Sequence, residues 1–237
     1  MMAGAFLDIY CGPAPVPGDI WTRWNFDPPL VVALILLALA IGRRWAGALA
    51  VGVLFVAFVS PLCALSAALF SARVAHHVLL VAVAAPLLAM VWPARSSRPA
   101  TPAFLISTVI LWGWHLPAAY DPAMGHVGVY WLMQLTLLGS AVMFWRAVLG
   151  PEQAPGRALP FILAGYMQMA FLGALLTFAP DALYAIHQVA PLAWGYSPLA
   201  DQQLGGLIMW VPAGLPFLVF GALVARRGWR SIGGQAA

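Results

Sequence analysis

Long apolar runs separated by short polar segments constrain this chain more than any other feature. Seven such runs follow one another, at residues 30–42, 46–67, 74–91, 103–117, 128–148, 159–179 and 204–224. A helix needs about 20 apolar residues to cross the hydrocarbon core of a bilayer, and most of the runs approach that length. The pattern predicts an all-α membrane protein, a bundle of seven transmembrane helices.

The composition excludes an ordinary soluble fold. Charged residues make up 8% of the chain and hydrophobic residues 63%, whereas soluble domains carry about 25% charged residues. The formal net charge of +4 does not indicate a nucleic-acid partner, because all eleven basic residues are arginines that do not cluster along one face. The expected surroundings are the lipid bilayer.

The arginines predict the orientation of the chain. If all seven runs span, one side receives Arg43, Arg44, Arg95, Arg98, Arg146, Arg157, Arg226, Arg227 and Arg230, and the other receives Arg23 and Arg73. Basic residues accumulate on the cytoplasmic side of membrane proteins. We therefore expect the N-terminus outside and the C-terminus in the cytoplasm. The acids, Asp8 among them, lie mostly on the opposite side, but acids contribute little to orientation.

The same map divides the chain into three parts. Residues 1–29 form an outer N-terminal tail with interfacial aromatics, residues 30–225 the membrane domain, and residues 226–237 a basic cytoplasmic tail. The run at 30–42 is short enough that a re-entrant or buried helix is an alternative to a span. The spacing of Cys11 and Cys63 does not indicate a disulfide framework. Both cysteines fall near the predicted outer face, where a pair is geometrically possible.

The predicted topology brings all five histidines to the outer side. His76 and His77 begin the third run, His115 ends the fourth, and His126 and His187 lie in outer loops. Titratable residues at the mouth of a membrane helix indicate a functional site. Imidazole is a common ligand for copper, zinc, iron and nickel. A two-histidine metal site would use His77 and His115, with His76 assisting, whereas a purely structural role at the interface is the alternative.

Other side chains could support this site. Met124, Met169 and Met209 offer thioethers that favour Cu(I), although core packing is the simpler interpretation. Arg73 lies in the first turn of its helix, where a positive charge is unfavourable, so we expect an acidic partner such as Asp201 or Asp27. Asp201 begins the seventh run and could equally cap that helix. We expect His126 and His187 to be ordinary loop residues.

Several motifs, taken together, resemble the CtaG-type cytochrome c oxidase assembly factors of bacterial membranes. They are WNFDPPL (24–30), SPLCAL (60–65), LFSARVAHHVLL (69–80) with APLL (85–88), WGWHLPAAYDPA (112–123), FW (144–145) and PLADQQLGGLIMW (198–210). His77, His115, Asp201 and Gln202 match positions of the family pattern. The chain departs from it at Arg73, Tyr130 and Gln134, where members tend to carry histidine, and at His76, where they tend to carry glutamine.

The resemblance implies a seven-helix protein of the bacterial inner membrane that is not an enzyme. It implies assistance to the maturation of a haem–copper oxidase, at the stage of copper insertion on the outer face. The expected partners are an oxidase subunit or its copper chaperones, copper is the expected metal, and Arg73, Asp201 and Gln202 are supporting residues.

Three other functions remain open from the sequence. The chain could be a membrane scaffold that holds an oxidase subunit without metal. It could be a haem or quinone redox protein with two axial histidines. A copper-permeation protein is the weakest alternative, because no histidine falls near the bilayer midplane.

Overall fold

The computed structural model describes residues 9–94 and 99–233, and this part is helical without strands. Asp8, Arg95 and Arg98 lie outside the described residues. The elements are η1 (Ile20–Thr22), α1 (Pro28–Ile41), α2 (Trp45–Phe58), α3 (Pro61–Ala68), α4 (Phe70–Val78), η2 (Leu79–Ala84), α5 (Ala85–Val91), α6 (Ala100–Trp114), α7 (Pro117–Gly125), α8 (Val127–Leu149), α9 (Pro155–Thr177), η3 (Ala185–His187), η4 (Ala190–Trp194), α10 (Pro198–Trp210) and α11 (Gly214–Gly233).

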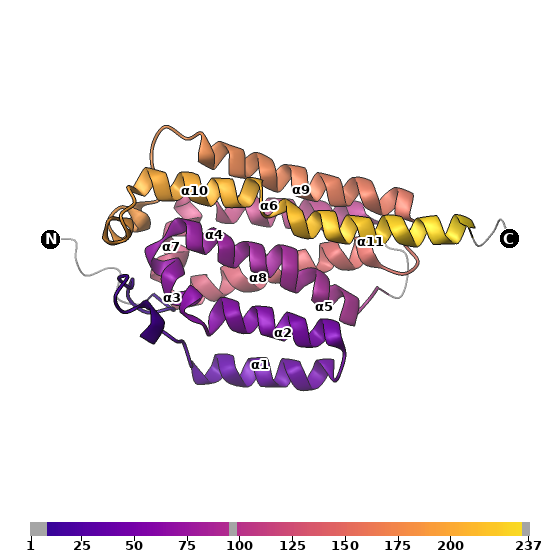
Figure 1. Ribbon diagram of the computed structural model, residues 1–237, viewed down its shortest axis with the longest axis horizontal. Coiled ribbons are helices and arrows are strands. Elements are labelled where there is room, and N and C mark those ends of the chain that lie inside the picture. The colour runs from indigo at the N-terminus through magenta and orange to yellow at the C-terminus, as the bar shows by residue number, and fades with distance from the viewer. Residues whose placement is uncertain (1–8, 95–98, 234–237) are drawn as a thin grey trace.

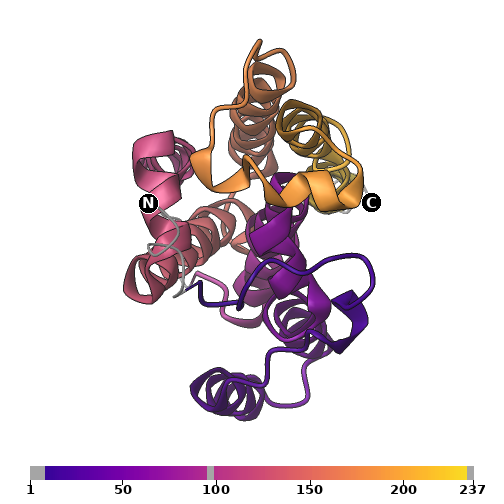
Figure 2. The same cartoon turned by 90° about the vertical axis from the view of Figure 1, so that its left-hand side faces the viewer.

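The long helices run side by side along one axis (Figure 1). The continuous α4–η2–α5 rod lies inside the bundle, where α5 and η2 pack on α8 and α4 packs on α10. Helix α1 lies at the edge against α2, and α9 lies with α10 and α11 on the far side (Figures 1 and 2). Residues 9–27 and the turns η3 and η4 cover the end of the bundle where α4 begins, which we call the histidine end.

Within the described part, four helical stretches are long and apolar enough to cross a membrane: Phe70–Val91, Val127–Leu149, Pro155–Thr177 and Pro198–Arg230. Two bent pairs raise the number to six if each is one span: α2 with α3, bent by 46°, and α6 with α7, bent by 73°. Helix α1 has 14 residues and is therefore about 21 Å long, less than the roughly 30 Å of hydrocarbon. The multi-pass membrane character is confirmed, whereas seven spans are not, and the orientation remains a prediction.

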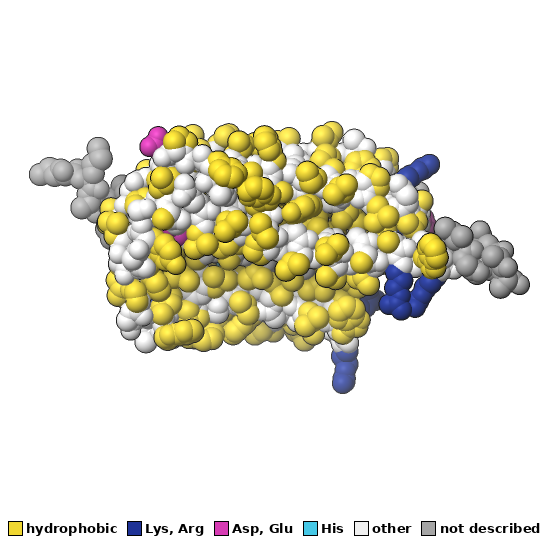
Figure 3. Space-filling model, turned by 45° about the horizontal axis from the view of Figure 1, so that its top comes forward, with side chains coloured by type: hydrophobic (Ala, Val, Ile, Leu, Met, Phe, Trp, Pro, Cys, Tyr) yellow, Lys and Arg dark blue, Asp and Glu magenta, His cyan; other side chains and the backbone are white. Residues whose placement is uncertain are grey.

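The surface agrees with a lipid environment. Hydrophobic side chains cover most of the face in Figure 3, and arginine side chains project near the end where α11 finishes. At that end, Arg227 donates to the backbone carbonyls of Leu149, Gly150 and Gln153. Helix α11 continues through the basic residues to Gly233, so the segment from residue 226 begins as helix.

A π-helical turn interrupts the central rod just before Pro86. In π-helical register the N–H of residue 86 would bond to the carbonyl of Val81, but proline has no N–H. The indole nitrogen of Trp145 donates to that carbonyl instead, at 2.8 Å. A side chain from α8 therefore satisfies the backbone group that proline frees inside the apolar core.

The N-terminal segment is fastened to the histidine end. A disulfide joins Cys11 to Cys63 of α3, the pairing that the sequence left open. Tyr10 stacks on Tyr130 of α8 at 5.0 Å between ring centroids, and its hydroxyl donates to Asp27 at 2.8 Å. This segment therefore covers the outermost turn of α8.

Candidate functional site

Three histidines lie together inside the histidine end. The ring centroids of His77 and His115 are 6.0 Å apart, and those of His76 and His77 are 5.8 Å apart. The exposed fractions of the three residues are 0% for His76, 2% for His77 and 6% for His115. The structure therefore brings together the two helices, α4 and α6, that the sequence selected for a two-histidine site.

The backbone fixes the orientation of the His115 ring. Its Nδ1 lies 2.7 Å from the carbonyl oxygen of Leu111, one turn earlier in α6. A carbonyl only accepts, so Nδ1 carries the proton and Nε2 presents its lone pair. The Tyr184 hydroxyl donates to the carbonyl of His115 itself at 2.9 Å. This arrangement resembles the support given to metal-binding histidines, in which one ring nitrogen is held by a carbonyl.

Both ring nitrogens of His76 and of His77 lack a hydrogen-bond partner among the described residues. The same holds for the side-chain amide of Gln134 and all three guanidinium nitrogens of Arg73. Buried polar groups are nearly always paired, so a cluster of unpaired ones requires an explanation. Nine of the ten such atoms in the described part belong to these four residues, and the tenth is the hydroxyl of Thr108.

Arg73 is completely buried, and its guanidinium lies over the Tyr130 ring at 5.2 Å from the centroid. Neither Asp201 nor Asp27 forms an ion pair with it within the described part, so the expectation of such a partner is wrong. Asp27 accepts from Tyr10, and Asp201 is held by the backbone of α4. Contact with the face of an aromatic ring offsets only part of the free-energy cost of burying a cation.

Asp201 caps a helix, but not the one expected. It lies in the first turn of α10, whose N-cap is Ser197, whereas its carboxylate accepts from the backbone nitrogens of Phe70 and Ser71, at 2.6 and 3.2 Å. The Ser71 hydroxyl donates to it at 2.5 Å. The chain breaks at the extended residue Leu69 between α3 and α4, which leaves the first amides of α4 inside the protein. A carboxylate from another helix satisfies them.

Gln202 organises the loop before α10. Its Oε1 accepts from the amide of Leu183 at 2.7 Å, and its Nε2 donates to the carbonyl of Asp181 at 3.2 Å. The supporting role expected for Gln202 is therefore one of shaping the loop that carries Tyr184, the residue that holds the His115 carbonyl.

The remaining histidines are not part of the cluster. His126 is exposed at the start of α8. His187 is buried in η3, where its Nδ1 donates to the carbonyl of Ala68 at 3.3 Å and its Nε2 accepts from the Tyr120 hydroxyl at 2.8 Å. Burial lowers the pKa of His187 to about 4. His187 is therefore a neutral structural residue that fastens the loop between α9 and α10 to α3 and α7, rather than an ordinary loop residue.

Met124, Met169 and Met209 are buried in the hydrophobic core, the packing role that the sequence favoured. Sequence reasoning did not select Tyr130 and Gln134 as site residues in their own right. Their separation by four residues, which places them on one face of α8, was the available signal. The burial of both residues, and the contact of Tyr130 with Arg73, emerge only from the fold.

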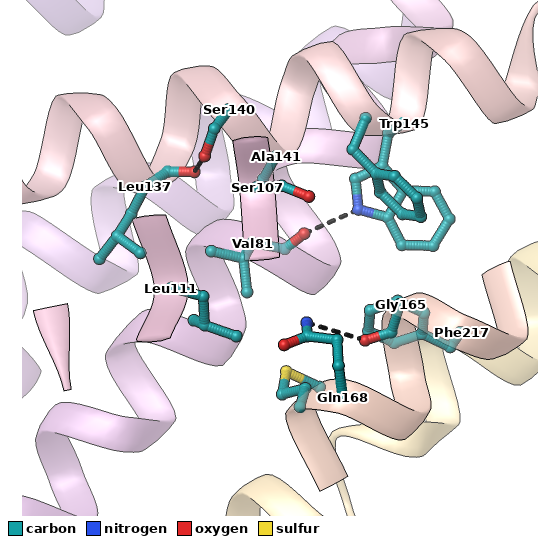
Figure 4. Close-up of a pocket in the computed structure, with 12 residues that line it drawn as sticks. Val81, Ser107, Leu111, Leu137, Ser140, Ala141, Trp145, Gly165, Gln168 and Phe217 are labelled. Atoms are coloured by element: carbon teal, nitrogen blue, oxygen red, sulfur yellow. Dashed lines mark hydrogen bonds between the residues drawn. The ribbon is translucent and has the colours of Figure 1, made fainter. Parts of the chain in front are cut away.

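A separate cavity of about 40 Å³ lies deeper in the bundle, between η2, α6, α8, α9 and α11 (Figure 4). Its polar groups are already engaged: Gln168 donates to the carbonyl of Gly165, and Ser107 and Ser140 donate to backbone carbonyls of their own helices. Leu111, whose carbonyl holds His115, lines one side. The cavity therefore ends one turn below the histidines and is not part of their cluster.

The separation of the His77 and His115 rings can be compared with that of two imidazoles bound to one metal ion. A metal lies about 2 Å from an imidazole nitrogen, which places two rings on one ion up to roughly 6.4 Å between centres, close to the observed 6.0 Å. No group of three or more His, Cys, Asp or Glu side chains suited to a metal occurs in the described part.

These features define a multi-pass helical membrane protein with a buried polar cluster at one end. The model of the family described as cytochrome c oxidase caa3 assembly factor matches residues 96–231, more than half of the chain. The chain belongs to this family, which confirms the resemblance. The matched region contains His115, Asp201 and Gln202, whereas Arg73, His76 and His77 precede it. Searches of curated proteins and of solved structures each gave no significant match.

Proposed function

We propose that this protein assists copper insertion into a haem–copper oxidase at the outer face of a bacterial inner membrane. Copper is its cargo and not a resident cofactor. His77 and His115 hold Cu(I) during transfer, and His76 stands beside them as an exchange ligand. Membership of an oxidase assembly family supports the general role and agrees with a non-catalytic function.

The observation that carries the proposal is the His77–His115 pair. The two ring centroids are 6.0 Å apart, with the rings edge to face at 74°. The Nδ1–H of His115 is engaged, which leaves Nε2 available to ligate, and neither nitrogen of His77 has a hydrogen-bond partner among the described residues. Uncharged imidazoles lower the cost of burial before the ion arrives. Ligand exchange between His76 and His77 would let the ion move toward a receiving subunit without a change of oxidation state.

The test is copper stoichiometry in detergent-purified protein loaded anaerobically with Cu(I). Wild type is expected to retain close to one copper per chain, and the double variant His77→Ala/His115→Ala little. The exposed His126→Ala provides the matched control, because it removes an imidazole from the same end of the bundle without touching the cluster. Undiminished copper in the double variant would exclude this site.

A metal-free scaffold for an oxidase subunit is the second candidate. Two observations favour it. No three His, Cys, Asp or Glu side chains in the described part are placed to hold one metal ion together, and the permanently charged Arg73 lies on the same face of α4 as His77. Under this alternative the His77→Ala/His115→Ala variant still co-purifies with the oxidase and still supports its assembly, although it binds no copper. Loss of oxidase copper in that variant would decide against the scaffold.

A further inference from the structure

The unpaired guanidinium of Arg73 points to a ligand that the two-histidine site alone does not explain. An arginine side chain cannot lose its proton in a protein, so it cannot become neutral as a buried lysine can. Arg73 is 0% exposed and forms no ion pair in the described part, and its guanidinium interacts with the side chain of Tyr130. A buried charge without a partner is among the costliest features of a fold.

The acids near the histidine end are already committed. Both oxygens of Asp201 accept hydrogen bonds from the start of α4. The carboxylate of Asp121 accepts from the amides of Ala185 and Ile186. Asp27 accepts from Tyr10. Compensation for Arg73 therefore has to come from outside these side chains.

Two adjacent helix faces supply the polar and aromatic surroundings of Arg73. Arg73 and His77 are four residues apart on α4, and Tyr130 and Gln134 are four apart on α8, so each pair shares a helix face. Both helices begin at the histidine end (Figure 1), and Arg73 lies over Tyr130. One turn further along, His77 and Gln134 therefore lie at similar depth. The Gln134 amide supplies an N–H donor that has no partner.

We infer that Arg73, with Gln134, binds a monoanionic ligand of the copper cargo, either a halide from solution or a thiolate from a copper donor. This inference rests on the proposed copper function. Cu(I) carries one positive charge, and a halide or thiolate carries one negative charge. The ion enters as a neutral unit: bonds form from copper to His77 and His115, the donor's other ligands leave, the anion stays on copper beside Arg73, and no electron is transferred.

The positive charge of Arg73 favours an anion-bound Cu(I) over a bare Cu(I). A second positive charge several ångströms from a buried guanidinium is strongly repelled, by on the order of tenfold to a hundredfold in affinity at an effective dielectric constant of about 20. A monoanion between the two cations removes this repulsion and supplies the missing partner of Arg73. The soft ligands that Cu(I) prefers include thiolate.

The experiment is copper K-edge X-ray absorption on Cu(I)-loaded full-length protein in three buffers: bromide, gluconate, and gluconate with mercaptoethanol. Wild type is expected to show one bromine neighbour of copper in bromide and one sulfur neighbour with the thiol. These two arms separate a halide from a thiolate. Arg73→Gln is expected to lose both neighbours. Arg73→Lys, whose amine can carry the positive charge when the anion lies beside it, is expected to retain them. Arg23→Gln, which removes an exposed arginine paired with Asp19, is the control.

A Cu(I) competition titration provides the second readout. In gluconate, Arg73→Gln is expected to bind copper at least tenfold more tightly than wild type, because the repulsion is gone, and in bromide this advantage should disappear. Copper bound by nitrogen ligands alone in all wild-type samples would overturn the inference and leave the copper function standing. Absence of copper from wild type in every buffer would overturn the copper function itself. If Arg73→Gln does not fold, the wild-type and Arg73→Lys spectra still show whether an anion is bound to copper.

Discussion

The carboxylate of Asp201 accepts a hydrogen bond from the backbone nitrogen of Phe70 at 2.6 Å, across 131 residues of sequence. It joins the first turn of α10 to the first turn of α4, directly before Arg73. A negative charge at a helix N-terminus also stabilises the helix dipole. This one side chain therefore positions the helix that carries His76 and His77.

Asp201→Ala should destabilise the protein by about 3 kcal/mol, because it leaves two buried amides and the Ser71 hydroxyl without an acceptor. Asp201→Asn should cost less, since its amide oxygen still accepts. Thermal unfolding in detergent measures the effect. Asp181→Ala, at an exposed position, is the control. An unfolding midpoint for Asp201→Ala equal to that of Asp181→Ala would contradict this role.

Helices α9 and α10 meet at two glycines, which gives a second prediction. A Cβ on Gly206 would lie 2.5 Å from the carbonyl oxygen of Gly173 and 2.6 Å from the backbone nitrogen of Thr177. Small residues at such crossings let membrane helices approach closely. Gly206→Ala should therefore force the helices apart and cost roughly 1–3 kcal/mol.

Gly139→Ala is the matched control for Gly206→Ala, because a Cβ at that helical position meets nothing within 4 Å. It should leave the unfolding midpoint unchanged or raise it slightly, since alanine favours helix more than glycine does. Equal effects of the two substitutions would show that the close crossing of α9 and α10 does not limit stability.

The disulfide between Cys11 and Cys63 should stabilise the histidine end by closing a loop with a sequence separation of 52. The entropy of such a loop corresponds to about 4 kcal/mol. Reduction, or Cys11→Ser/Cys63→Ser, should lower the unfolding midpoint and expose residues 9–27 to protease first. The double variant should no longer respond to reductant. Protease resistance of this segment in the reduced wild type would show that Tyr10 and its stacking partners suffice.

The sequence predicted the helical membrane bundle, the family and the histidine pair, because each depends on strong local signals. The length of an apolar run identifies a membrane helix. Side chains near the ends of such helices can meet when those ends lie at the same side of the bundle. His77 and His115 could be paired from topology alone, since both lie about one turn inside the same boundary. The number of spans was less certain, because one bend, at Ser60–Pro61, divides an apolar run that looks continuous, and a second, at Leu116–Pro117, turns the chain at the end of another run.

The partners of charged residues could not be predicted. Asp201 lies in the first turn of its own helix, which favours a local cap, yet it caps α4. This choice depends on the break at Leu69, where a single extended residue turns α4 away from α3. The apolar pattern places Leu69 between the runs at 46–67 and 74–91, but it does not show that the break is one extended residue directly before α4. Contacts between segments that are distant in sequence determine which helix Asp201 caps, and a single sequence does not reveal those contacts.

The contact between His187 and Tyr120 predicts a pH-dependent stability. Burial holds the pKa of His187 at about 4, below the ordinary value of 6.5. Above pH 6.5 the residue is neutral in both the folded and the unfolded chain, so its contribution to the free energy of unfolding does not change with pH. As the pH falls from 6.5 to about 4, only the unfolded chain gains a proton, so stability falls. The total loss is roughly 3 kcal/mol for this residue.

His187→Gln separates this contribution from that of the other titratable groups. A glutamine can still donate to the Ala68 carbonyl and accept from the Tyr120 hydroxyl, but it does not titrate. The decrease in unfolding midpoint between pH 7 and pH 4.5 should therefore be smaller in this variant than in wild type. His126→Gln, at an exposed histidine, should retain the full wild-type decrease. If His187→Gln showed that full decrease as well, the buried neutral state of His187 would not govern the stability of the loop between α9 and α10.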